Sequence, residues 1–173
     1  MTSLYMMIFN LVSFQAIWWL GVLWGNVYLW LSSLLLLGHF VLSKHKMRDL
    51  RVMWFVSLIG ISVDAALIFS GFFIFSSTPV WLMVLWGIFA ISLQYSLGFL
   101  SRLSVYLQAI FGGVFGTISY LAGYKFGAVE LGYSMTNSVI ALILIWSILL
   151  PVLIAIANMS AVNRGQDDQS ITQ

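Results

Sequence analysis

Residues 52–75 read VMWFVSLIGISVDAALIFSGFFIF, an almost unbroken apolar run with a single carboxylate, Asp64, near its middle. A helix of this length crosses a hydrocarbon core of roughly 30 Å, which would place Asp64 close to the centre of the bilayer. An aspartate there costs about 2.5 to 3.5 kcal/mol on insertion scales. We therefore expect the other helices to form a wall around Asp64 that supplies polar partners, water or a proton.

The composition of the chain points to lipid as its main solvent. Hydrophobic residues make up 62% of the sequence and charged residues 7%, against roughly 45–50% and 25% in soluble domains. The sequence therefore predicts a multi-pass membrane protein with one domain, residues 1–160. The first apolar segment lacks a basic leader region and is expected to be a retained helix. A polar tail, residues 161–173, is expected to be disordered and cytoplasmic.

Short polar breaks divide the apolar sequence into six segments. The predicted fold is an all-α transmembrane bundle of six helices, at residues 7–24, 27–43, 52–75, 79–100, 104–123 and 137–158. Pro151 is expected to kink the sixth helix. Six of the seven Lys and Arg residues fall on one side of this arrangement and only Lys125 on the other, so both termini are expected to be cytoplasmic.

Small and polar residues recur at helical spacing on one side of each of the first five segments. The stripes predict a polar cavity near the bilayer centre, formed by Asp64, Gln15, Gln94 and Tyr120. The same stripes also suit close helix packing, because small residues let helix backbones approach and polar residues bond across the contact. Asn10 and Ser119 lie on the same stripes, so the candidate ligand-binding residues are Asn10, Gln15, Asp64, Gln94, Ser119 and Tyr120.

Three ionisable residues are candidates for catalysis, and each also has a structural explanation. Asp64 is either a functional acid or a protonated group hydrogen-bonded to its neighbours. His39 acts either as a hydrogen-bonding residue between helices or as a proton relay. Glu130 is either an exposed loop charge near Lys125 or part of a re-entrant segment that lines an outer vestibule. The basic run KHKMRDLR, residues 44–51, fits a topology signal that contacts anionic lipid head groups.

Several chemistries have no support in the sequence. The chain has no cysteine, which excludes disulfides, thiolate nucleophiles and iron–sulfur ligation. No predicted span contains a lysine for a Schiff base, and His39 with Asp64 supplies at most two metal ligands. Phosphate-binding and dinucleotide-binding fingerprints are absent. We therefore expect no cofactor, no metal and no nucleic-acid partner.

Five stretches spread over the chain carry a resemblance to a known family. They are FNLVSFQAIWWLGVLWG (9–25), GISVDAALIFSG (60–71), LWGIFAISLQYSLGFL (85–100), GGVFGTISYLAGYKFGAVEL (112–131) and WSILLPVL (146–153). Together they resemble a bacterial membrane family described as domain of unknown function 2878. The resemblance implies a bacterial inner-membrane protein of about six spans without an assigned activity. One departure is the pair Gln94-Tyr95, where an asparagine-histidine pair is expected, which argues against a role for that histidine here.

These observations lead to three functional hypotheses. The first is binding of a small amphiphile or lipid in the cavity, with Asp64 as hydrogen-bond anchor or proton acceptor. The second is a membrane enzyme of lipid modification, with Asp64 or Glu130 as acid or base. The third is a structural or assembly subunit, in which the polar stripes pack against a partner helix or a second copy of the chain. The sequence does not decide between an enzyme and a binding protein.

Overall fold

A computed structural model of the chain describes residues 4–162 and confirms the predicted all-α fold with six helices. The fifth helix is continuous from Val105 to Lys125, and its middle section has π-helical hydrogen bonding. The helical segments are α1 (Leu4–Trp24), α2 (Leu29–Leu42), α3 (Lys46–Phe69), α4 (Val80–Ser92), α5 (Val105–Phe111), η2 (Gly112–Gly116), α6 (Thr117–Lys125) and α7 (Met135–Val162). A short 3₁₀ helix, η1 (Gly98–Arg102), precedes α5. The expected tail lies outside the described residues from Asn163 onward.

Four of these helices are long and apolar enough to cross a membrane. They are α1, α3, the continuous helix from α5 to α6, and α7. The other two, α2 and α4, are apolar but have only 14 and 13 residues. At 1.5 Å per residue each is roughly 20 Å long, less than the roughly 30 Å of a hydrocarbon core.

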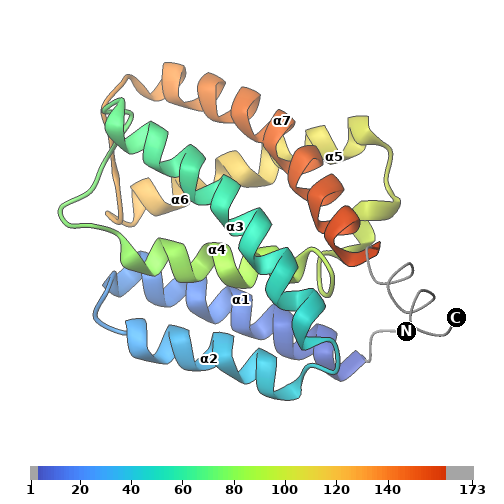
Figure 1. Cartoon of the computed structure of the whole chain (residues 1–173). Helices are drawn as coiled ribbons and strands as arrows, with labels where there is room; N and C mark the ends of the chain where they lie inside the picture. The colour runs from blue at the N-terminus through green and yellow to red at the C-terminus, as the bar shows by residue number, and fades with distance from the viewer. Residues whose placement is uncertain (1–3, 163–173) are drawn as a thin grey trace, which may run out of the picture.

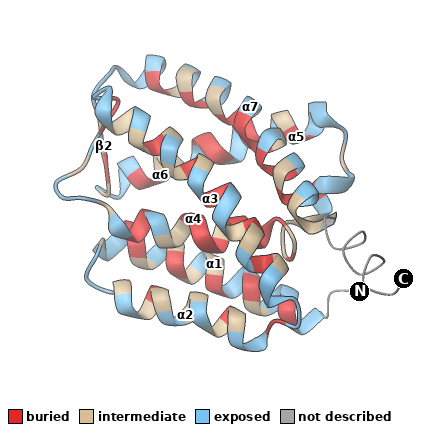
Figure 2. Ribbon diagram, viewed as in Figure 1, coloured by how far each residue is buried: buried red, intermediate tan, exposed pale blue. Residues whose placement is uncertain are grey.

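Helix α4 is the most enclosed element of the bundle. It packs against α1, α2 and α3, while α7 packs against α3 and along the helix that runs from α5 to α6 (Figure 1). Eight of its 13 residues are buried, which includes Trp81 and Trp86. The buried residues of the chain face the interior, and exposed residues cover the outward sides of the surrounding helices (Figure 2). Many of the exposed side chains are large and apolar, for example Trp54 on α3 and Ile148 on α7, as expected of a surface in contact with lipid.

Two of the helices that end at a glycine, α3 and α6, are each followed by a short strand. Gly71 after α3 and Gly127 after α6 have φ angles of 72° and 78°, which favour glycine. Both ends have the paired hydrogen bonds of a Schellman motif: Phe72 N to Leu67 O with Gly71 N to Ile68 O, and the equivalent pair around Gly127. The strands β1 (Phe73–Ile74) and β2 (Glu130–Leu131) pair antiparallel. Strand β2 lies between the last two helices, where the sequence predicts a loop or a re-entrant segment around Glu130.

The fourth helix is shorter than predicted. The expected segment was 79–100, but α4 ends at Ser92. The chain then turns, and Asn10 of α1 stabilises the turn because its Oδ1 accepts hydrogen bonds from the Ser96 backbone N and hydroxyl. The third helix is shifted relative to its prediction. It begins at Lys46, inside the basic run, and ends at Phe69.

Candidate functional site

Asp64 is buried in α3 and is held by two aromatic hydrogen-bond donors. Its side chain is 3% exposed. Trp86 of α4 donates from Nε1 to Oδ2 at 2.6 Å, and Tyr120 of α6 donates from its hydroxyl to Oδ1 at 2.6 Å. The carboxyl group therefore joins three helices through one hydrogen bond on each oxygen.

Glycines position the rings around Asp64. Gly60 lies one helical turn before Asp64, and a Cβ atom there would overlap the indole of Trp86. Gly116 lies one turn before Tyr120, and a Cβ atom there would overlap the indole of Trp146. One glycine from each of the third and fifth segments thus makes room for a tryptophan ring.

The aromatic rings next to Asp64 stack in ordered pairs. Trp86 and Trp146 are nearly parallel, with ring centroids 5.9 Å apart and an interplanar angle of 7°. Phe73 of β1 stacks on Tyr120 with centroids 5.0 Å apart and an angle of 4°. Phe89 meets Trp86 edge to face. These contacts fix the orientation of the two rings that donate to the carboxyl group.

The rings border a hollow of about 580 Å³, which we call the aromatic hollow. Five tryptophans line it together with Tyr120 and several phenylalanines, and its polar side chains include Gln15 and Ser119. Asp64 is not among the lining residues, but both of its hydrogen-bond donors are. The lining includes Gln15, Trp18, Trp19, Trp81, Trp86, Ser119, Tyr120, Ala122 and Trp146.

Asp64 instead borders a second hollow of about 490 Å³, on the other side of Trp86. Its wall includes Ser77 and Thr78 from the segment between β1 and α4. Phe75, Leu82 and Trp86 line both hollows. The buried acid therefore lies beside the wall that the two hollows share.

The structure places the candidate ligand-binding residues at different positions. Tyr120 bonds Asp64, and Ser119 lines the aromatic hollow and accepts a hydrogen bond from Trp18 Nε1 at 3.0 Å. Gln15 also lines this hollow, but Gln94 lies in the turn after α4 and lines neither hollow.

Four of the candidates, Asn10, Gln15, Gln94 and Ser119, do not reach Asp64. Within residues 4–162, Gln15 and Gln94 make no hydrogen bond to it, and Asn10 bonds Ser96 instead. Sequence reasoning missed Trp86, because a tryptophan near the end of a predicted span is typical of an interfacial aromatic belt. The signal that would have found it is its indole N–H, a donor that needs a partner once it is buried.

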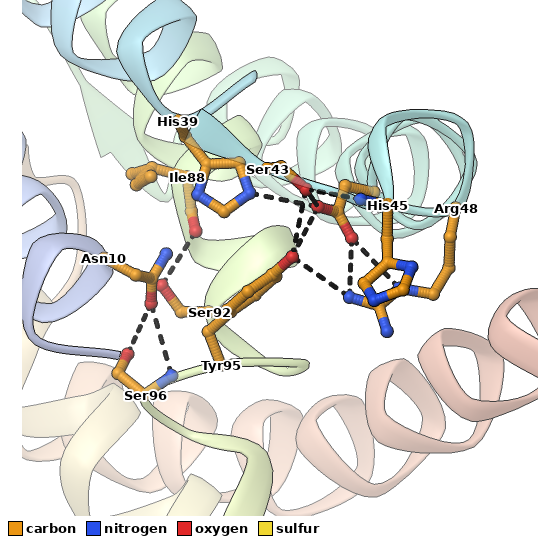
Figure 3. Close-up of polar contacts among 10 residues, drawn as sticks. Asn10, His39, Ser43, His45, Arg48, Ile88, Ser92, Tyr95 and Ser96 are labelled. Atoms are coloured by element: carbon orange, nitrogen blue, oxygen red, sulfur yellow. Dashed lines mark hydrogen bonds and ion pairs between the residues drawn. The ribbon is translucent and has the colours of Figure 1, made fainter. Parts of the chain in front are cut away.

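A second buried acid, Asp49, lies in the first turn of α3, at the end opposite Asp64. Figure 3 shows the polar contacts among the side chains there, which include His39, Ser43, Arg48 and Tyr95. We call His39, Ser43, Arg48, Asp49 and Tyr95 the Asp49 cluster. Oδ2 of Asp49 accepts from the Ser43 hydroxyl and, at 2.6 Å, from the Tyr95 hydroxyl, and it lies 3.2 Å from His39 Nε2. Arg48 donates to Oδ1 from Nε at 3.0 Å and from Nη2 at 2.8 Å.

The Asp49 cluster joins α2, the start of α3 and the turn after α4. Asp49 is 1% exposed, so its charge needs the cationic partner that Arg48 supplies. His39 also lies edge to face against Tyr95, with ring centroids 4.8 Å apart. Its Nδ1 atom, like Nδ2 of Asn10, is buried with no hydrogen-bond partner among the described residues.

Sequence reasoning missed this cluster because Asp49 lies in a run of basic residues that is typical of a solvated loop. The missed signal is a spacing: His39 and Ser43 lie one turn apart at the end of a helix, and one acid follows shortly after them among cations. Tyr95, which stands where the family resemblance leads us to expect a histidine, supplies a hydrogen bond to that acid.

Glu130 takes no part in the hydrogen bonds of Asp64 or of the Asp49 cluster. It is exposed on β2 and lines neither hollow. Among residues 4–162, no group of three or more His, Cys, Asp or Glu side chains is arranged to hold a metal ion.

Comparison with known proteins places the chain in a family. No curated protein and no solved structure matches it. The model of a family described as "Protein of unknown function (DUF2878)" matches residues 7–152, which is most of the chain. The match spans α1 to the middle of α7, so it contains both buried acids and the aromatic hollow. The chain belongs to the DUF2878 family.

Proposed function

We propose that this protein binds a small amphiphile or a lipid in the aromatic hollow. The observation that carries the proposal is the lining of the hollow, in which a few polar groups face a wall of aromatic rings. Ligand pockets typically combine an apolar wall with a small number of polar groups that fix orientation. The volume of about 580 Å³ is within the roughly 300–1,000 Å³ that such pockets occupy.

The polar groups suit the head of an amphiphile. Gln15 of α1 makes no hydrogen bond to another described residue, so its amide is free to bond a ligand. Ser119 accepts from Trp18 and keeps its own hydroxyl hydrogen for a second contact. The apolar part of the ligand would lie against the tryptophan and phenylalanine rings.

In this proposal Asp64 positions other side chains and does not touch the ligand. Both of its oxygens accept hydrogen bonds from rings that line the hollow. Loss of these bonds would release Trp86 and Tyr120 and change the shape of the wall. Asp64 thus holds two side chains of the binding site in place without contacting the ligand.

A cavity-filling variant tests the proposal. Ala122 lines the aromatic hollow, so Ala122→Leu should occupy part of the space. Ala155 is exposed on α7, and Ala155→Leu adds the same atoms outside the hollow. The protein in lipid nanodiscs should bind n-decanol saturably, with a change in tryptophan fluorescence, and Ala122→Leu should weaken this binding while Ala155→Leu does not. Equal binding by all three proteins, or saturable binding by none, would overturn the proposal.

We also propose that the chain lies in a bacterial inner membrane, with the start of α1 and the end of α7 on the cytoplasmic side. The start of α1, the start of α3, the 3₁₀ helix η1 and the end of α7 lie at one end of the bundle (Figure 1). That end contains Arg48, Arg51 and Arg102, whereas Lys125 ends α6 at the other. Short loops rich in Lys and Arg remain in the cytoplasm, which supports this orientation.

A further inference from the structure

We infer that the ligand of the aromatic hollow is a lipophilic cation, with an amine or quaternary ammonium head. This inference rests on the proposed binding function and specifies the charge of the ligand. Three features support this inference. They are the hydrogen bonds that Asp64 accepts, the absence of a cation paired with it among the described residues, and the aromatic rings that lie between Asp64 and the aromatic hollow.

The hydrogen bonds of Asp64 suit an ionised carboxylate. The indole Nε1 of Trp86 can only donate, and the Tyr120 hydroxyl donates to the other oxygen. A protonated carboxyl group would bring a donor of its own, for which only the Tyr120 oxygen is in reach, and that tyrosine would then no longer donate to Oδ1. Two donors aimed at two oxygens therefore match the charged form.

That charge has no counter-ion among residues 4–162. The other buried acid, Asp49, forms an ion pair with Arg48, but no Lys, Arg or His of the described residues pairs with Asp64. A buried charge without a partner is costly. A positive group held in the aromatic hollow, with the Trp86 and Tyr120 rings between it and Asp64, would lower that cost by charge attraction without touching the carboxylate.

The rings between Asp64 and the aromatic hollow favour the same kind of ligand. Aromatic faces attract cations through the ring quadrupole, and cages of aromatic rings are used to bind quaternary ammonium groups. A hydrogen bond from the Tyr120 hydroxyl and the Trp86 N–H to a carboxylate makes both rings more electron-rich, which strengthens this attraction. Phe73 covers one face of Tyr120, so the ring meets the hollow by its other face or its edge.

The lining of the aromatic hollow also excludes the opposite charge. It contains no Lys, Arg or His, so an anionic head group would find no cation and would be repelled by the nearby Asp64. A neutral amphiphile would neither be attracted to the aromatic faces as a cation is nor be repelled by Asp64 as an anion is. The three classes of ligand should therefore bind in the order cation, neutral, anion.

Three probes with the same chain test the inference on the full-length protein in nanodiscs of zwitterionic lipid: decyltrimethylammonium, n-decanol and decyl sulfate. The cation should bind at least about tenfold more tightly than n-decanol, because a desolvated cation on aromatic faces gains this much. Decyl sulfate should bind most weakly. If all three bind equally, or the neutral probe binds best, the inference is wrong and the proposed function stands. If none binds saturably, the proposed function itself fails.

Two matched variants assign the preference to Asp64. Asp64→Asn keeps the shape of the side chain and removes its charge, so the preference for the cation over n-decanol should fall to about a third or less of its original ratio. Glu130→Gln removes one carboxylate from the exposed strand β2 and should leave the ratio unchanged. An unchanged ratio in Asp64→Asn would overturn the inference. If Asp64→Asn does not fold, the order of the three probes on the unmodified chain still decides it.

Discussion

Asp64 accepts one hydrogen bond on each oxygen, and Tyr120 supplies the one on Oδ1. Tyr120→Phe keeps the ring and removes this donor, which leaves a buried carboxylate oxygen without a partner. We expect the free energy of unfolding to fall by about 1–3 kcal/mol. The measurement is unfolding of the purified protein in mixed maltoside and dodecyl sulfate micelles.

A matched control is available in the same helix. Tyr124→Phe removes the hydroxyl of an exposed tyrosine for which the described structure shows no hydrogen bond, and it should change stability little. Equal stability of Tyr120→Phe and the unmodified chain would show that the hydroxyl does not hold the acid.

Asp49 is a different kind of buried acid, because its charge is compensated within the protein. Asp49→Asn would place an amide N–H₂ group among the donors of Ser43, Tyr95 and Arg48, and it would leave the Arg48 charge without its partner. Because the Arg48 side chain is 23% exposed, the main cost is that of buried donors left without an acceptor, about 1–3 kcal/mol. We expect a loss of this order in the same unfolding measurement.

Glu130→Gln provides the comparison for Asp49→Asn, since it makes the same chemical change at an exposed residue and should be nearly neutral. A loss in Asp49→Asn no larger than that of Glu130→Gln would mean that the Asp49 cluster does not stabilise the fold.

The two acids differ in how far the sequence could predict their surroundings. A single acid inside an apolar run draws attention to Asp64, and helical spacing made Tyr120 a candidate partner. The contact of Trp86 with Asp64 and the contacts within the Asp49 cluster depend on which faces of different helices meet. Residue spacing within one helix does not determine this. Gln15 and Gln94 carry suitable side chains, but the rotation and length of their helices direct them elsewhere.

The α3–α4 contact depends on a glycine. Trp86 lies on α3 where Gly60 has no side chain, and a Cβ there would overlap the indole. Gly60→Ala should push α4 away from α3 and weaken the Trp86 bond to Asp64. Overpacking of this kind costs about 1–3 kcal/mol, and unfolding in mixed micelles measures it.

Gly38 of α2 is the matched control for Gly60. A Cβ atom there would meet Phe9 Cζ at 3.4 Å, an ordinary contact. Gly38→Ala should be neutral or stabilise the chain by up to about 1 kcal/mol, because alanine favours a helix. If Gly60→Ala were as well tolerated as Gly38→Ala, the close approach would not be a feature of the folded protein.

At the level of helices, apolar length predicted the fold well and the helix ends less well. Six apolar runs gave six helices, because in lipid a buried backbone satisfies its hydrogen bonds most simply within a helix. The early end of α4 was not predictable from hydropathy, since residues 93–100 remain largely apolar. The turn there depends on Asn10, a contact between residues 86 positions apart.

The whole bundle separates positive charge between its two ends, and this separation predicts its orientation. A single cysteine can be introduced anywhere without interference, because the chain has none. Arg102→Cys lies at the end proposed to be cytoplasmic, and Lys125→Cys lies at the opposite end. In intact bacterial cells a membrane-impermeant maleimide should label Lys125→Cys, provided the outer membrane admits the reagent, and should label Arg102→Cys only after the inner membrane is disrupted. The unmodified cysteine-free chain gives the background signal. Labelling of Arg102→Cys but not Lys125→Cys in intact cells would reverse the orientation, and it would show that the charge bias of these loops does not set the topology of this protein.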